Sequence, residues 1–312
     1  GEAAAAYFIY GSEGEKGGAP ENLMIMLDVG GGTTDIAIWR QEQVIWRGSY
    51  RIAGGLFFTQ YLANNPELLV DIDFDQVAAN MAGHSREQAA NFVELFVNAP
   101  DFTRRFDEKY PFFSEKRAGV GLRQCAQVAL GGLMHYVGLV LGRLMADEAL
   151  PNRPTPADLR NLTFAFAGRG SAFFRHLTAG DPRDNDLTRL CSLAVARADP
   201  ALLDGARVST LFSPMPKHEV ARGLLTVQAG AGPVRTSVST AEPLGEAVRY
   251  QGVDGPRDAE VATDATALFG ATGADEVEPS ELRRFLADLR RLTGLAVDLE
   301  TGGREGGATV RR

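Results

Sequence analysis

The sequence predicts an α/β fold for most of this 312-residue chain, and three observations support it. Two continuous apolar runs, residues 23–27 and 162–167, have the length and composition of strands that are covered on both faces of a sheet. Each run ends in a glycine-rich turn. Helical patterns separate and follow the runs, and the recurrence of strand, glycine turn and helix is typical of α/β domains.

The first predicted elements are a helix, a loop and three strands. The alanine-rich segment 3–10 favours a helix, and the segment 11–21, rich in Gly and Glu, favours a loop. The strand at 23–27 is followed by strands at 36–39 and 44–46 with a short turn between them, which predicts a three-stranded meander. Gly54 and Gly55 then open a helix that ends near residue 63.

A helical insertion and a second group of strands form the middle of the chain. Residues 66–118 are predicted to be an inserted helical subdomain, after which a helix over 124–145 returns the chain. Strands at 162–167 and 207–212 precede a helix from 217 to about 227. Residues 1–65 and 119–230 are therefore predicted to form one α/β subdomain.

Residues 231–312 are predicted to form a small C-terminal α/β extension without an assigned role. The segment is rich in Gly, Ala, Thr and Pro, and residues 301–312 are expected to be disordered. One amphipathic helix stands out, with Ser280 as its N-cap and an apolar face made of Leu282, Phe285, Leu286 and Leu289.

Charge and cysteine content exclude several classes of protein. The chain has 32 Lys and Arg against 40 Asp and Glu, a net charge of −8, which argues against a nucleic-acid partner. Cys125 and Cys191 have no Cys-x-x-Cys neighbour, so neither a disulfide scaffold nor a cysteine-rich zinc site is expected. A reducing, cytoplasmic location fits best. The first residue is not Met, so we expect it to lie inside a longer polypeptide.

One stretch is a candidate membrane span. Residues 124–142 carry no Lys, Arg, Asp or Glu, but Gln124, Gln127 and His135 interrupt the apolar run. We therefore predict a buried helix rather than a membrane helix, and expect Gly138 and Gly142 to admit a neighbouring strand or a ligand.

The strongest functional signal is the segment from Asp28 to Asp35. Three consecutive glycines between a buried strand and its return strand allow backbone amides to form a nest for an anion such as phosphate. Asp28 and Asp35 would face the same mouth, where a magnesium ion bound to phosphates needs carboxylates. The alternative is a glycine hairpin with two solvated aspartates, which does not require three glycines between acids on buried strands.

These residues resemble the second phosphate-binding motif of the superfamily that contains actin, the seventy-kilodalton heat-shock chaperones, the bacterial actin-like proteins and the sugar kinases. Four further segments resemble family motifs and occur in the same order. They are the alanine-rich helix led by Glu2, the Gly54-Gly55 pair, the adenosine motif at 164–171, and the connecting helix around 213–223.

The resemblance implies the second half of an actin-like ATPase, a ribonuclease-H-like lobe with an inserted helical subdomain. It further implies ATP and Mg²⁺ as cofactors, a nucleotide cleft completed by an N-terminal lobe before Gly1, and ATP hydrolysis only when both lobes are present. Catalytic and metal-binding roles fall on Asp28 and Asp35, with Glu2 acting on the metal through water. Nucleotide contacts fall on Gly30, Gly31, Gly32, Thr33, Thr34, Gly168, Arg169, Gly170 and Ser171.

Two functions from different classes follow from this resemblance. The first is an ATP-dependent conformational switch that passes its motion to a protein partner. The second is a nucleotide-sensing or catalytically inert scaffold for protein partners. A small-molecule kinase is a third possibility, but it needs a base from the absent lobe.

The other candidate residues have simpler explanations. The four histidines are scattered without metal-ligand spacing, and the late arginines are expected to form a solvated helix face. These residues are His84, His135, His176 and His218, and Arg283, Arg284, Arg290 and Arg291.

Overall fold

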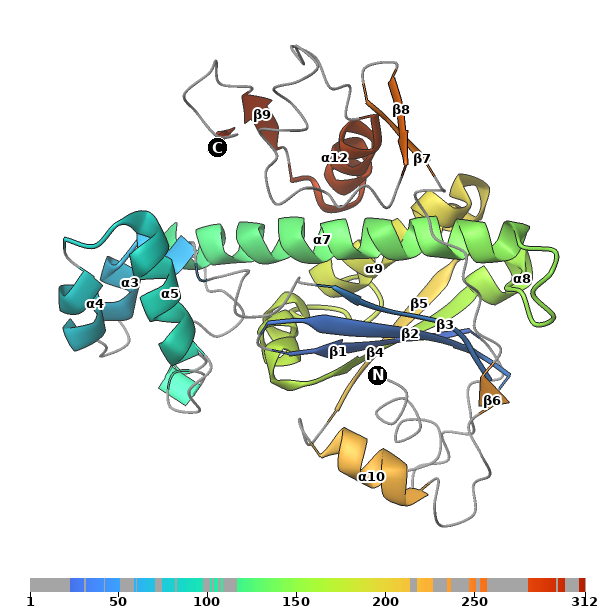
Figure 1. The fold of residues 1–312 in the computed structure, drawn as a ribbon, viewed down its shortest axis with the longest axis horizontal. Coiled ribbons are helices and arrows are strands. Elements are labelled where there is room, and N and C mark those ends of the chain that lie inside the picture. The colour runs from blue at the N-terminus through green and yellow to red at the C-terminus, as the bar shows by residue number, and fades with distance from the viewer. Residues whose placement is uncertain are drawn as a thin grey trace.

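A computed structural model of the chain contains one central mixed β-sheet with helices packed on it (Figure 1). The structure describes residues 23–30, 32–41, 43–50, 59, 61–70, 75–81, 83–97, 102, 104–105, 108, 117–213, 218–226, 235–236, 247–250, 253–256, 280–295, 297–300 and 309–311. The predicted helix at 3–10, Glu2, Gly31 and the Gly54-Gly55 pair lie outside these residues.

The sheet confirms the predicted meander and both later strands. Its strand order is β5-β4-β1-β2-β3-β6. Strands β1 (Met24–Val29), β2 (Thr34–Arg40) and β3 (Gln43–Tyr50) are antiparallel neighbours. Strand β4 (Asn161–Ala167) lies parallel to β1, and β5 (Arg207–Phe212) lies parallel to β4. The short β6 (Arg235–Thr236) pairs with β3.

The two faces of the sheet carry different apolar sets because side chains alternate along a strand. The first set belongs to the main core and includes Ile25, Leu27, Ile36, Ile38, Phe164 and Phe166. The second set is smaller and consists of Met24, Met26, Ala37, Trp39, Val44, Ala165 and Ala167. Asp28 follows Met26 in the same alternation, so its side chain lies on the face of this second set.

Helices α7 (Arg117–Ala146) and α9 (Asp186–Ala198) cover the main-core face of the sheet. They pack closely because α7 has glycines at the contact. A Cβ atom on Gly138 would lie 2.6 Å from the Ala194 carbonyl oxygen, and Gly142 faces Ala198. The prediction that these glycines admit a strand or a ligand was wrong, because their neighbour is the helix α9.

Residues Val120–Ala146 of α7 are long and apolar enough to cross a membrane. More than half of the most apolar window in this segment is buried inside the protein. The helix contacts α9 and lies along the sheet (Figure 1), as a core helix of an α/β protein does. Its composition is explained by this burial.

Between β3 and α7 the described residues are helical. They include α3 (Glu67–Val70), α4 (Asp75–Met81) and α5 (Arg86–Val97), which lie together at one end of α7 (Figure 1). Tyr61 packs over Gly121 near the start of α7 and links this end of the helix to the preceding segment.

Short helical elements occur in the connections after α7. They comprise α8 (Pro156–Leu159), the 3₁₀ helices η2 (Arg169–Leu177) and η3 (Pro200–Gly205), and α10 (Glu219–Thr226). Helix η2 directly follows β4, so the chain turns at Gly168 and Arg169 without a long loop.

The C-terminal region forms a helix and two small hairpin-like pairs of strands. Strand β7 (Ala247–Tyr250) pairs with β8 (Val253–Pro256), and β9 (Asp298–Glu300) pairs with β10 (Thr309–Arg311). Thr309–Arg311, which lie in the segment expected to be disordered, pair with β9 in this structure. Helix α12 (Ser280–Thr293) begins at Ser280, which is its first helical residue rather than its N-cap.

Candidate functional site

The candidate site lies at the carboxyl ends of the parallel strands. Because β1, β4 and β5 run in the same direction, Gly30, Gly168 and Ser213 follow them at one edge of the sheet. Ligands of open α/β sheets bind at this end of the sheet, just outside the carboxyl ends of the strands. The two predicted binding segments, 28–35 and 168–171, therefore meet at the edge where a ligand is expected.

Asp28 and Asp35 are direct cross-strand partners in the β1–β2 register. Both are partly exposed, and Asp28 lies beside Ala167 of β4 on the second face. Directly opposed residues have Cβ atoms about 4.5–5.5 Å apart, and two like charges at this spacing are destabilising unless a cation lies nearby. The structure thus brings the two predicted carboxylates together as an acidic pair.

The turn between these strands is closed by a backbone hydrogen bond. The Gly30 amide donates to the Thr33 carbonyl oxygen at 2.8 Å. This bond occupies the Gly30 amide, which we predicted to contact phosphate, so the amide donors for an anion must come from the tip of the turn. Gly32 and Thr33 are exposed there.

Gly168 packs directly against the end of β1. Its backbone has φ +76° and ψ 159°, a region that is essentially restricted to glycine. A Cβ atom on Gly168 would contact the Val29 carbonyl oxygen and would lie 2.6 Å from Asp28 Oδ1. Gly170 is similarly close, because a Cβ atom on Gly170 would lie 2.8 Å from the Gly30 carbonyl oxygen. Because these two glycines lack a side chain, segment 168–171 can pack directly against the end of β1, where segment 28–35 begins.

Two predicted side chains are directed away from this surface. Thr34 is fully buried and alternates with Asp35, so it points to the main-core face with Ile36. The Ser171 hydroxyl is also buried and donates to the Gly168 carbonyl oxygen at 2.7 Å. Neither hydroxyl is available to a ligand in this arrangement, whereas Arg169 is exposed at the edge.

Arg175 is a contributor that sequence reasoning missed. Its Nη2 donates to the Ser213 carbonyl oxygen at 2.8 Å, and its guanidinium lies 5.5 Å from the centroid of the Phe212 ring. These contacts tie η2 to the end of β5 and so fix the third strand end at the site. The local sequence carries no signal for them, because the partners are far apart in the chain.

The acidic pair fits a hydrated magnesium ion better than a fully protein-coordinated metal. Within the described part of the chain, no group of three His, Cys, Asp or Glu side chains is placed to hold a metal ion. Magnesium usually keeps several waters and binds proteins through one or two carboxylates together with substrate phosphates. Asp28 and Asp35 have this donor chemistry.

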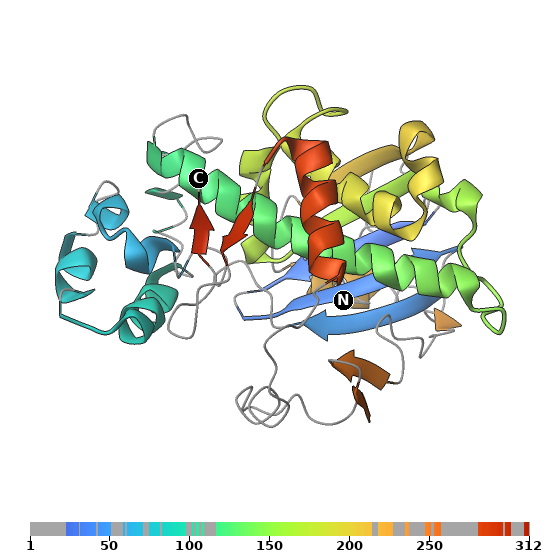
Figure 2. The same ribbon diagram turned by 90° about the horizontal axis from the view of Figure 1, so that it is seen from above.

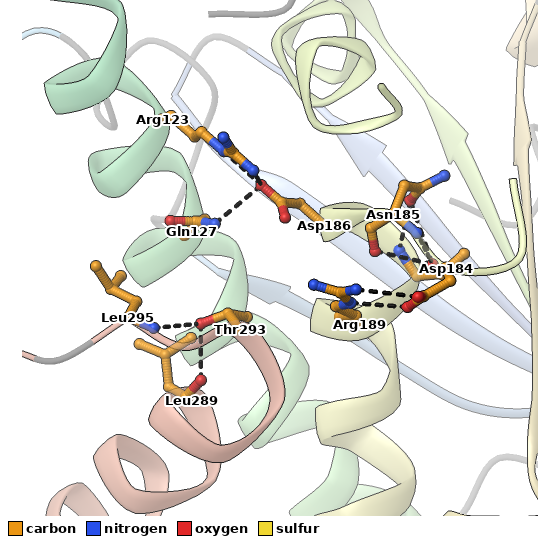
Figure 3. A network of polar contacts seen from close by, with 10 residues as sticks. Arg123, Gln127, Asp184, Asn185, Asp186, Arg189, Leu289, Thr293 and Leu295 are labelled. Atoms are coloured by element: carbon orange, nitrogen blue, oxygen red, sulfur yellow. Dashed lines mark hydrogen bonds and ion pairs between the residues drawn. The ribbon is translucent and has the colours of Figure 1, made fainter. Parts of the chain in front are cut away.

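A polar network on the main-core side fixes α9 but does not belong to the site (Figure 3). Asp186 accepts hydrogen bonds from Arg123 at 2.5 Å and Gln127 at 3.0 Å, both from α7. Arg189 makes two bonds to Asp184 and lowers the pKa of that carboxyl. The network joins the first turn of α9 to α7, and the helix begins after Asn185, whose side chain accepts a hydrogen bond from the Thr188 amide at 2.9 Å.

Comparisons with known proteins find a likeness at the level of solved structures. No protein-family model matches the chain, and no curated protein matches it. Among solved structures, a chain of a PilM-PilN type IV pilus biogenesis complex aligns with 14% sequence identity and a TM-score of 0.28. The alignment covers 74% of this chain and 52% of the other, so this chain spans about half the length of that neighbour.

Proposed function

We propose that this chain is the nucleotide-binding lobe of an actin-like ATPase that acts as a nucleotide-dependent conformational switch. The observation that carries the proposal is the acidic pair Asp28–Asp35, joined by a glycine turn and packed against the backbone of Gly168. The order β3-β2-β1-β4-β5, a meander followed by two parallel strands, supports the ribonuclease-H-like sheet that the motifs imply.

The roles of the residues follow from their positions. Asp28 and Asp35 would hold magnesium-bound water, and the exposed tip at Gly32 and Thr33 would contact phosphate oxygens. Arg169, exposed next to Gly168, would lie beside the adenosine. Magnesium, when bound, neutralises phosphate charge and orients the attacking water. A second lobe would supply the opposite wall of the cleft and exclude bulk water.

A nucleotide-sensing or inert scaffold for protein partners is the second candidate. Two observations favour it: the Ser171 hydroxyl bonds to the Gly168 carbonyl, and the Thr34 side chain is buried on the opposite face. Fewer groups are then left to act on the transferred phosphate. Binding of nucleotide would persist in such a protein while hydrolysis would be lost.

A magnesium titration of nucleotide binding tests the proposal. Asp28→Asn keeps the size of the side chain and removes its charge, so it should weaken the magnesium-dependent part of ATP binding. Asp35→Asn should have a smaller effect of the same kind. Binding is followed with a fluorescent ATP analogue on a protein that carries both lobes, together with single-turnover hydrolysis.

Asp204→Asn is the matched control, because Asp204 is exposed on η3 away from the acidic pair. Its magnesium titration should overlap that of the unmodified protein. Overlapping titrations for Asp28→Asn as well would contradict the metal-binding role. Binding without any hydrolysis in the unmodified protein would favour the scaffold.

A further inference from the structure

We propose that the surface of α7 and α9 around Gly131 is a helix-binding groove and that α12 is its built-in, displaceable ligand. The groove lies on the side of α7 opposite the sheet, and α12 crosses α7 there (Figures 1 and 2). The proposal concerns a different surface from the acidic pair and does not depend on the function proposed for it.

The groove exists because α7 lacks a side chain at Gly131. A Cβ atom on Gly131 would lie 3.1 Å from Leu289 Cδ1, 3.2 Å from Phe285 Cε2 and 3.3 Å from Leu193 Cδ1. Side chains from α12 and α9 thus converge on the space above this glycine. His135, one turn further along α7, meets the Phe285 ring edge-on with centroids 5.6 Å apart.

Helix α12 has the pattern of a groove-bound peptide. Phe285 and Leu289 are four residues apart, face the groove, and are the buried residues among the described side chains of α12. The opposite side is exposed and basic. Amphipathic helices that bind grooves use anchors with this spacing. The exposed basic residues are Arg283, Arg284, Arg290 and Arg291.

Release of α12 would break no strand pairing of the central sheet. The helix packs on α7 and α9 and contributes nothing to the strand order, and residues 213–279 separate it from β5. An isolated helix of 14 residues is marginal in water, so the helical structure of α12 depends on the groove. Local opening of such an element costs less than global unfolding.

Hydrogen exchange on the unmodified full chain is the first test. Because release of α12 leaves the sheet and α7 intact, amides of 283–292 should exchange about tenfold faster or more than amides of 130–141 in α7. Equal exchange rates for the two segments would mean that α12 opens only with the whole fold, and would overturn the proposal.

Peptide competition is the second test, with a fluorescent peptide of residues 280–295 as the probe. The full chain carrying Phe285→Ala and Leu289→Ala should bind this peptide about tenfold or more tighter than the unmodified chain, because its own helix no longer competes. The chain with Arg290→Ala, an exposed position, should behave as the unmodified chain. A peptide with the same two alanines should not bind.

Three results would overturn the proposal. One is a folded double variant that fails to bind the peptide. Another is a double variant that loses the circular dichroism of the folded chain, since a displaceable helix is not required for the rest of the fold. The third is a concentration-dependent dimer of the unmodified chain in sedimentation, with α12 still protected, because the groove would then hold the helix of a second copy.

Discussion

At the scale of single residues, Gly168 decides whether the two binding segments can touch. Its positive φ and its contact with Val29 and Asp28 leave no room for a side chain. We expect Gly168→Ala to lower the free energy of unfolding by about 1–3 kcal/mol through backbone strain, with a further loss from displacement of β1. Chemical denaturation followed by circular dichroism measures this.

The variant Gly180→Ala separates backbone strain from the steric displacement of β1. Gly180 also has a positive φ, +96°, but its ideal Cβ has no heavy atom within 4 Å. It should therefore show the backbone cost without the steric one, and Gly168→Ala should be the more damaging change. Equal losses for the two variants would indicate that the contact with β1 is unimportant.

The two thiols should be unreactive in the folded chain. Burial raises the pKa of the Cys125 thiol to about 11 and raises the pKa of the Cys191 thiol well above its usual value. At pH 7 both are neutral thiols, and the thiolate is the reactive form. Alkylation by iodoacetamide should be slow in the native protein and fast in denaturant.

The same thiols affect stability at high pH. Below the ordinary thiol pKa of 9.0, the thiols of the folded and the unfolded chain are both protonated, so they do not affect stability. Between pH 9 and about 11 only the unfolded Cys125 ionises, which favours unfolding, so stability should fall in this window. A Cys125→Ser variant should lose part of this pH dependence; an unchanged pH profile would contradict the assignment.

At the scale of elements, the packing of α7 on α9 depends more on Gly138 than on Gly142. Gly138→Ala would place a Cβ 2.6 Å from the Ala194 carbonyl oxygen, and backbone cannot move aside easily. We expect a loss of about 1–3 kcal/mol from overpacking. Thermal and chemical denaturation measure it.

Gly142→Ala is the matched control on the same helix. Its Cβ would lie 3.7 Å from the Ala198 carbonyl oxygen, an ordinary contact. Alanine also has the higher helix propensity, so this variant should be neutral or more stable by up to about 1 kcal/mol. A destabilised Gly142→Ala would show that the helix contact is tighter than the structure indicates.

The strands could be predicted from the sequence because their signals are local. Residues 23–27 and 162–167 are continuous apolar runs, and both became central strands with buried faces. The pairing of Asp28 with Asp35 could also be anticipated, since a short turn between two strands fixes their register.

The rest of the site depends on contacts between distant segments. The bond from Arg175 to Ser213 and the position of Gly168 beside Asp28 require β4 and β5 to lie next to β1, which local patterns do not encode. The inward direction of Thr34 follows from the alternation in β2 and could have been recognised from the buried residues that follow it.

At the scale of the whole molecule, the described lobe provides one wall of the proposed cleft. A nucleotide bound to it alone would lose about half of the contacts that normally bury a ligand. Residues 1–312 alone should therefore bind ATP weakly and show negligible turnover. Isothermal titration calorimetry checks this, and a submicromolar dissociation constant would contradict the two-lobe arrangement.

The position of β1, between β2 and β4, has a consequence for the order of folding. Its antiparallel neighbour follows it immediately in the chain, whereas its parallel neighbour comes only after the helical segment and α7. Loop closure makes such distant pairings slow, so the hairpin of β1 and β2 should form first. The two aspartates would then lie opposite each other before Gly168 comes to lie beside Asp28. Because two opposed carboxylates disfavour the hairpin, magnesium added during refolding should accelerate the phase in which β1 and β2 pair.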